Sequence, residues 1–264
     1  MKKSLLILLF FLTVQIVAPI VAFVLSNLNG LLNNDPSGLQ EMNIEPILLG
    51  RSLLVGNLVL IGLLALLKLM RPVKGLVFQR TDMRLLGWTL LGTLLFSLGL
   101  SWLLAPLQLT DNDAMKMFQG MRSDVLCLLL LVLIGPFTEE LVFREGILRS
   151  LWEKRWSAWA AALTAAVFFA IVHGNLYQAI PAAILGFVLG LFYLRSRNLS
   201  LCFPAHAINN GLAALLLYFP EWETTLTFTP FISVGVGIIF CTAALSIFHF
   251  KLELSKYFST PYKQ

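Results

Sequence analysis

The chain has 264 residues, of which 58% are hydrophobic and only 12% are charged. Soluble domains carry about 25% charged residues, so this composition excludes a water-soluble globular protein and indicates a chain solvated by lipid. The formal net charge of +5 does not point to a nucleic-acid partner, because the basic residues lie between apolar runs and act there as topology signals.

Apolar runs long enough to cross a membrane follow one another along the chain. A helix needs about 20 apolar residues to span the hydrocarbon core, and the sequence predicts eight such helices. The predicted spans are residues 4–26, 50–70, 85–108, 125–143, 157–174, 177–194, 200–219 and 230–250. We therefore predict an all-α fold, a polytopic membrane helix bundle that forms a single domain over residues 1–264.

The basic residues are unevenly distributed between the two sides of these spans. With the N-terminus in the cytoplasm, 16 of the 19 Lys and Arg residues fall on the inside, and only Arg51, Lys116 and Arg122 fall outside. This is the positive-inside pattern of membrane proteins. The sequence thus predicts a multi-pass protein of the cell membrane, with the N-terminus and the C-terminus both cytoplasmic.

A polar cluster ends the fourth predicted span, with the sequence Gly-Pro-Phe-Thr-Glu-Glu-Leu-Val-Phe-Arg over residues 135–144. Adjacent helical residues point about 100° apart, so the two acids cannot share a face. Glu140 precedes Arg144 by four residues, the favourable order for an ion pair, which leaves Glu139 free to face a cavity. Pro136 removes a backbone hydrogen bond and is expected to loosen the helix. Taken alone, the cluster also fits an ordinary solvated helix end.

Two further spans carry a histidine. Phe169 and His173 are four residues apart in one span, and His206 and Asn210 are four apart in another, so each pair shares a helix face. Asn209 points away from that face. Alone, His173 is equally typical of a helix end at the membrane interface. The pair of His206 and Asn210 is equally typical of side chains that form hydrogen bonds between helices. Ionisable groups inside spans cost about 2.5–3.5 kcal/mol on insertion scales and usually have a function.

Together the three clusters supply one free carboxylate, two imidazoles and one carboxamide. This set can activate a water molecule and stabilise an oxyanion, as a hydrolase requires. Two other functions use the same residue types. A proton-coupled transporter could relay protons through the acid and the imidazoles, although no inverted repeat is apparent. A catalytically silent immunity or regulatory protein could associate through Gly186-x-x-x-Gly190.

The motifs Glu139-Glu140-x-x-x-Arg144, Phe169-x-x-x-His173 and His206-x-x-x-Asn210, in this order, resemble those of the CPBP family. That family comprises the type II CAAX prenyl endopeptidases and the Abi-type bacteriocin-processing proteases of bacteria. The resemblance covers a predicted catalytic core at residues 124–220, and the first three spans carry no signature. It implies an intramembrane endopeptidase that acts on a peptide or membrane-protein substrate in the lipid bilayer.

The resemblance also implies a role for each motif residue. Glu139 corresponds to the residue that activates water. The residues that position this water and stabilise the oxyanion are His173, His206 and Asn210, and those that give structural support are Glu140 and Arg144. One departure is Glu145, which stands where glycine is expected. This acid is expected at the cleft mouth, with an effect on substrate preference and not on chemistry.

The metal requirement is open at this point, since family members are described both as metalloproteases and as glutamate proteases. His173 and His206 are candidate zinc ligands, together with Glu139 and an open fourth position for water. Glu139 cannot readily act as both ligand and base, however, and the cluster offers no second unpaired acid. The sequence therefore slightly favours a site without a metal cofactor.

Counting residues along each span places Glu139, His173 and His206 at different depths in the membrane. If the fifth span begins at Ser157, His173 lies about 24 Å further along it, too far from Glu139 and His206. The three can meet if residues 150–159 lie along the interface, if helices tilt or break, or if an extended segment at 199–204 carries His206 deeper. The sequence leaves all three alternatives open.

Overall fold

The computed structural model describes residues 2–28, 43–71, 82–219 and 228–254. Helices make up most of these residues, and no strand occurs among them, which confirms the predicted all-α class. In chain order the elements are α1 (Lys2–Ser26), α4 (Pro46–Leu66), α6 (Met83–Leu104), η1 (Ala105–Leu107), α7 (Asn112–Met121), α8 (Val125–Leu129), η2 (Leu130–Ile134), α9 (Gly135–Glu140), η3 (Leu141–Leu148), α10 (Arg149–Glu153), α11 (Ala158–Ile171), α12 (Leu176–Ser196), α13 (Cys202–Tyr218) and α15 (Pro230–Phe250).

Each predicted span coincides with a helix, but eight full membrane crossings are not confirmed. By length and composition, six helices of the described residues can span a bilayer: Lys2–Ser26, Pro46–Leu66, Met83–Leu107, Val125–Glu153, Leu176–Ser196 and Pro230–Phe250. The other two predicted spans correspond to α11, with 14 residues, and α13, with 17 residues. At 1.5 Å per residue these helices measure about 21 Å and 26 Å, less than the ~30 Å hydrocarbon core.

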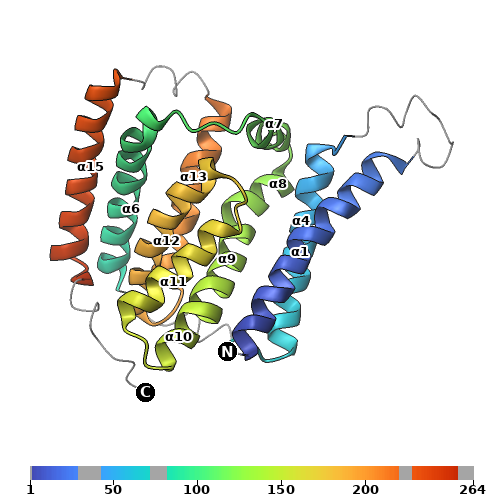
Figure 1. Ribbon diagram of the computed structural model, residues 1–264, viewed down its shortest axis with the longest axis horizontal. Coiled ribbons are helices and arrows are strands. Elements are labelled where there is room, and N and C mark those ends of the chain that lie inside the picture. The colour runs from blue at the N-terminus through green and yellow to red at the C-terminus, as the bar shows by residue number, and fades with distance from the viewer. Residues whose placement is uncertain (1, 29–42, 72–81, 220–227, 255–264) are drawn as a thin grey trace.

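Three antiparallel helix pairs flank a long central helix (Figure 1). α1 packs beside α4, α6 beside α15, and α11 beside α12. The central helix is continuous over Val125–Glu153, where α8, η2, α9, η3 and α10 follow without a break. α13 lies between α6 and the central helix and contacts both. The second and third predicted motifs therefore lie on helices that neighbour the one carrying Glu139.

The outer surface of the bundle is apolar. Phe231, Leu66 and Val125 are 90%, 79% and 74% exposed, and many other large hydrophobic side chains also face outward. A soluble monomer rarely exposes so large a contiguous apolar area, whereas lipid chains solvate it without cost. The exposure pattern thus supports a multi-pass membrane protein, while the orientation of the termini stays a prediction.

Aromatic side chains connect the central helix to two of the flanking pairs. Phe143 lies edge-on to Phe11 of α1 at 5.6 Å between ring centroids and to Phe169 of α11 at 5.1 Å. All three rings are at most 2% exposed. Because edge-to-face contacts fix relative ring orientation, this chain of rings sets the position of α11 against the central helix.

The start of the central helix is capped from outside the membrane span. The Asp124 carboxylate accepts hydrogen bonds from the backbone N–H groups of Leu126 and Cys127 and from the Arg51 guanidinium. The Arg51 bond and the backbone bonds lower the pKa of Asp124 to about 2, because they favour the ionised carboxylate. This contact connects α4 to the first turn of the central helix.

The Gly186-x-x-x-Gly190 pair lies where α12 packs against α11 of the same chain. A Cβ at Gly186 would lie 2.8 Å from Phe169, and one at Gly190 would lie 3.2 Å from Ala162. Both contacts are to α11, so the small residues let two helices of the same chain approach closely, as such motifs do in membranes. The pair is therefore occupied within the bundle, and it gives no support to the alternative of an associating scaffold protein.

The predicted interfacial segment at residues 150–159 is only partly as expected. Its first residues continue the central helix as α10, and Trp152 is only 1% exposed. Trp156 and Trp159, in contrast, are 45% and 48% exposed. The prediction failed for Trp152 because the helix continues through Glu153 and directs that ring into the core instead of along the membrane surface.

Candidate active site

The central helix changes its hydrogen-bond pattern around Gly135-Pro136, where the sequence predicts loosening. η2 is a π-helical turn, and the Gly135 N–H bonds to the Leu130 carbonyl five residues back. A Cβ at Gly135 would lie 2.9 Å from that carbonyl oxygen, so only glycine fits without a shift. A second π-helical stretch, η3, follows directly after Glu140. Such π segments are rare and are common at functional sites.

The π turn takes away the usual helical donors of the Leu131 carbonyl. The N–H four residues on, of Gly135, is used by Leu130, and Pro136, five residues on, has no N–H. The Asn210 Nδ2 group of α13 donates to the Leu131 oxygen at 3.0 Å. Asn210 therefore satisfies a partly buried backbone group, which would be costly if left unpaired in a membrane interior. It connects α13 to the central helix at this point.

The two adjacent acids have different environments. Glu140 has no exposed surface and pairs with Arg144, which is equally buried, at 3.2 Å between Nε and Oε2. This confirms the predicted ion pair. The Glu139 side chain is 24% exposed, and its Oε2 lies 3.5 Å from the His206 Nε2 atom. Glu139 is thus the accessible acid, as the helical geometry predicts, and it faces an imidazole.

His206 lies between the two acids. Its Nδ1 atom lies 2.8 Å from Glu140 Oε1, and its side chain is only 3% exposed. Because an ionised carboxylate only accepts, Nδ1 carries the proton, and the Nε2 atom of the neutral ring is left as an acceptor toward Glu139. A carboxylate and an acceptor nitrogen 3.5 Å apart can face each other only if they share a proton or both contact one water molecule. This arrangement can hold and transfer a proton.

Arg144 makes three contacts inside the bundle. Besides Glu140, it donates from Nη2 to the Gly186 carbonyl at 3.1 Å, and its guanidinium lies 4.9 Å from the centre of the Phe169 ring. Its Nη2 group and its aromatic face are satisfied, whereas Nε and Nη1 have no hydrogen-bond partner among the described residues, so the pair with Glu140 is held by charge. Arg144 therefore joins α12 and α11 to the carboxylate that orients His206.

Phe169 brings the two histidines together. Its ring lies edge-on to His173 at 4.8 Å and to His206 at 5.6 Å between centroids. The His173 Nδ1 atom also donates to the Phe169 carbonyl at 2.7 Å, which leaves the Nε2 atom of its neutral ring as an acceptor. In the described part of the chain, His173 makes no direct hydrogen bond to Glu139 or His206. The depth conflict is resolved because the central helix continues to Glu153, so Glu139 lies about as far from the turn before α11 as His173 does.

The two asparagines of α13 form a chain of hydrogen bonds that begins at Ser97. Ser97 of α6 donates to Asn209 Oδ1 at 2.8 Å, and Asn209 Nδ2 donates to Asn210 Oδ1 at 3.2 Å. Asn209 thus points to α6, away from His206, as the spacing predicts. It also supports Asn210, a contact that the sequence does not indicate. One N–H of Asn210 remains for a further acceptor, since its amide carries two.

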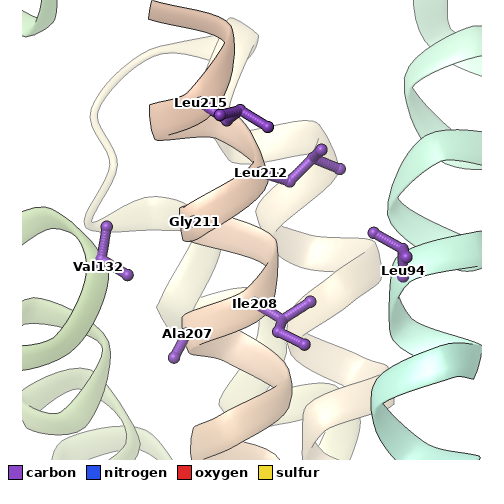
Figure 2. A pocket seen from close by; sticks show the side chains of 7 residues that line it. All are labelled: Leu94, Val132, Ala207, Ile208, Gly211, Leu212 and Leu215. Carbon is purple, nitrogen blue, oxygen red and sulfur yellow. The ribbon is translucent and has the colours of Figure 1, made fainter. Parts of the chain in front are cut away.

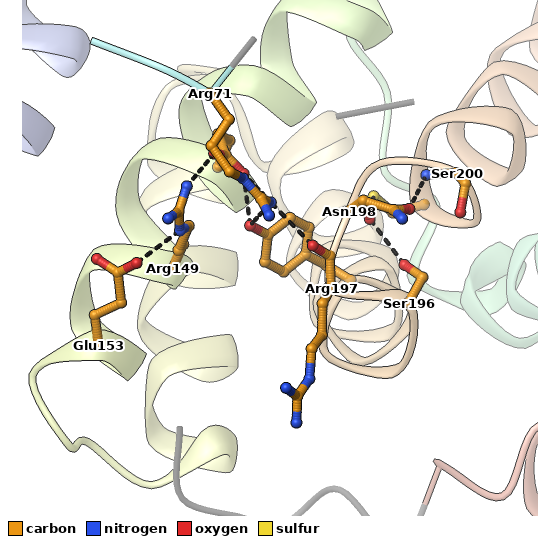
Figure 3. Close-up of polar contacts among 10 residues, drawn as sticks. Arg71, Arg149, Glu153, Ser196, Arg197, Asn198 and Ser200 are labelled. Carbon is orange, nitrogen blue, oxygen red and sulfur yellow. Dashed lines mark hydrogen bonds and ion pairs between the residues drawn. The ribbon is translucent and has the colours of Figure 1, made fainter. Parts of the chain in front are cut away.

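Glu145 does not line the apolar groove beside the candidate site. It is buried, accepts from both ends of the Arg71 guanidinium at 2.7 Å each, and accepts from the Tyr193 hydroxyl at 2.6 Å. Arg149 pairs with the same carboxylate and, at 2.7 Å, with Glu153 (Figure 3). Glu145 is therefore the centre of a structural ion network that connects the segment after α4 to the central helix. Spacing alone could not reveal it, because Arg71 lies 74 residues away in the sequence.

The donor geometry does not fit a metal ion held by three protein ligands. Within the residues that the structure describes, no three His, Cys, Asp or Glu side chains gather closely enough to hold one. The Nδ1 contacts of His206 with Glu140 and of His173 with a backbone carbonyl leave Nε2 of each ring available and are compatible with ligation, so the spacing of the side chains alone carries this conclusion. We therefore derive no step through a metal.

An apolar groove of about 520 Å³ runs along α13 beside this site. Ala207 and Gly211 face Val132 of the central helix, and Ile208 and Leu212 face Leu94 of α6 (Figure 2). All seven lining residues are apolar. Because these positions alternate along α13 with His206 and Asn210, the groove offers a hydrocarbon surface next to the polar residues.

Comparison with known proteins agrees with the motif analysis. Residues 121–212 match the family model described as Type II CAAX prenyl endopeptidase Rce1-like. The chain is also 30% identical over 88 residues to a protein of Bacillus subtilis (strain 168) named "Putative membrane peptidase YdiL". That similarity spans 33% of this chain and 36% of the relative's length. No solved structure matches the chain. The family match contains every motif residue from Glu139 to Asn210 and confirms the resemblance to the CPBP family.

Proposed function

Because residues 121–212 match the type II CAAX prenyl endopeptidase family, we propose that this chain is an intramembrane endopeptidase. It hydrolyses a peptide bond of a membrane-associated or peptide substrate. The observation that carries the proposal is the contact of the accessible Glu139 carboxylate with His206 Nε2 at 3.5 Å. An acid and an imidazole at this separation can share a proton or bind the same water molecule, as peptide hydrolysis requires.

In the proposed reaction Glu139 accepts a proton from water as the oxygen attacks the scissile carbonyl carbon. The tetrahedral oxyanion that forms is stabilised by the free N–H of Asn210, while the His206 Nε2 atom, an acceptor in the neutral ring, holds the attacking water through its second hydrogen. Glu139 then returns the proton to the leaving amine as the C–N bond breaks. His173, held by its bond to the Phe169 carbonyl, helps to position this water through its Nε2 atom. Glu140 and Arg144 keep His206 in its tautomer and orientation.

A proteomic comparison tests the proposal directly. Membranes from cells that express the natural chain and the Glu139→Gln form are compared for peptides with new N-termini. We expect at least one cleavage product that requires Glu139, because the variant keeps the fold but lacks the base. If the two membranes yield the same products, a silent immunity or regulatory protein, or a transporter, becomes the better description.

The apolar groove suggests how the substrate binds. We propose that a hydrophobic segment of the substrate lies against Ile208, Gly211 and Leu212, which brings its backbone toward His206. A Cβ at Gly211 would meet Val132 at 3.7 Å, an ordinary contact, so Gly211→Ala leaves the groove open. Gly211→Leu fills it. We expect Gly211→Leu to raise KM at least tenfold, whereas Gly211→Ala changes it less than twofold.

The measurement is steady-state cleavage of an identified substrate in detergent micelles by the two Gly211 variants. The Gly211→Ala protein is the matched control, since it changes the same backbone position without filling the space. An unchanged KM for Gly211→Leu would show that the substrate binds elsewhere.

We further propose that catalysis does not need a bound metal, and that Glu139 alone supplies the base. Zinc bound by His173 and His206 would need nitrogen atoms about 2.0–2.1 Å from the ion. Elemental analysis of active purified protein, combined with chelator titration, tests this point. We expect less than one-tenth of an equivalent of zinc and full activity after chelation. Stoichiometric zinc that is lost together with activity would contradict the proposal.

A further inference from the structure

A second cavity, of about 610 Å³, lies where the first turns of α1 meet the end of α4 and the last turns of the central helix. None of the motif residues lines it. Six cationic side chains do: Lys2, Lys3, Lys68, Arg71, Arg149 and Lys154. Among the described residues that line it, two carry carboxylates, Glu145 and Glu153.

The arginines form ion pairs with both carboxylates. Arg71 and Arg149 both pair with Glu145, and Arg149 also pairs with Glu153 (Figure 3). The four lysines form no ion pair with any residue in the described ranges. Four ammonium groups around one cavity repel each other, and an anion inside the cavity removes that repulsion. The surplus charge thus points to an anionic ligand.

The position of the cavity distinguishes a lipid from a small soluble anion. Ile7, Leu69 and Met70 form part of its wall. On the same turns of α1, Leu5 and Leu9 are 59% and 51% exposed, and in a bilayer these side chains contact acyl chains. A phospholipid can place its phosphate among the lysines and its chains along α1. A free phosphate ion would leave the apolar wall uncovered.

We propose that this cavity binds the phosphate headgroup of an anionic phospholipid, in the leaflet that meets the N-terminal end of α1. Lysines bind phosphate as point charges, and basic pockets between transmembrane helices are suited to acidic headgroups. Bound lipid would join α1 and α4 to the central helix through the charges of Lys3, Lys68 and Lys154. The proposal is independent of peptidase activity.

Thermal unfolding of the full chain in neutral detergent micelles tests the proposal. The probes are phosphatidylglycerol, phosphatidylcholine and inorganic phosphate, each added to the natural chain and to two double variants. Lys68→Gln with Lys154→Gln removes two cavity charges. Arg84→Gln with Lys251→Gln removes two charges of the same sign outside the cavity, where Arg84 is exposed and Lys251 lies over the Trp88 ring.

We expect phosphatidylglycerol to raise the Tm of the natural chain by roughly 5–10 °C at about 100 times its Kd. Phosphatidylcholine and inorganic phosphate should leave Tm within about 1 °C. The cavity variant should lose more than half of the shift, and the outside variant should keep it. Equal shifts in the two variants would overturn the site, and an equal shift with inorganic phosphate would overturn the lipid assignment.

Discussion

Replacing Glu139 by Gln is expected to lower turnover by about a thousandfold or more, within or above the 10²–10⁴ range typical of a general acid–base residue. Gln has nearly the shape of Glu but cannot accept the proton of the attacking water. The folded state should change little, because the Glu139 side chain is partly exposed and its nearest polar partner is His206. The measurements are the cleavage rate of an identified substrate and Tm in detergent.

Asp113→Asn is the matched control for this change. It also converts one carboxylate to an amide, on a side chain that is 95% exposed and far in sequence from the motifs. Both variants should unfold within about 2 °C of the natural chain, and only Glu139→Gln should lose turnover. If Glu139→Gln keeps near-normal turnover, another group is the base and the proposed mechanism is wrong.

Replacing Arg144 by Met should produce the largest loss of stability. Arg144 and Glu140 are both fully buried, so the variant leaves an unpaired carboxylate in the interior of the bundle. Breaking a buried ion pair from one side costs about 3–5 kcal/mol. The Gly186 carbonyl also loses its donor and Phe169 its cation. Chemical unfolding in mixed micelles measures the difference in free energy of unfolding.

A double variant separates charge from packing. Glu140→Gln combined with Arg144→Met removes both charges, and it should recover most of the lost stability because neutral replacement of a buried pair is often tolerated. Its turnover should remain low, since His206 Nδ1 then faces a neutral amide in place of a carboxylate. Arg51→Met, which breaks an ion pair whose arginine side chain is 52% exposed, should affect stability only slightly. An Arg144→Met protein as stable as the natural chain would contradict the assigned role.

Much of the candidate site follows from helical periodicity. The four-residue spacing of Glu140 and Arg144 predicts their ion pair, and the 100° offset of Glu139 predicts that this acid faces elsewhere. Both are found in the structure. These relationships could be predicted because they lie within one helix, whose geometry is nearly the same in every protein.

Relationships between helices could not be predicted in this way. The bond from His206 to Glu140 spans 66 positions, and that from Arg71 to Glu145 spans 74. A pattern within a span gives the face of each helix but not its height or rotation against a neighbour. Those are set by packing, here by the Phe143–Phe169 ring contact and by the close approach at Gly186.

The sequence by itself determined that the chain is an all-α membrane protein, where its helices lie, and which polar residues are out of place in lipid. It did so because the need to bury backbone polar groups and expose apolar side chains to lipid acts on each span separately. Only the tertiary structure decided that two of eight predicted spans are short, that Phe169 joins His173 to His206, and that Asn210 satisfies the Leu131 carbonyl. These depend on where one helix ends beside another, and that is fixed by the packing of side chains from distant parts of the chain.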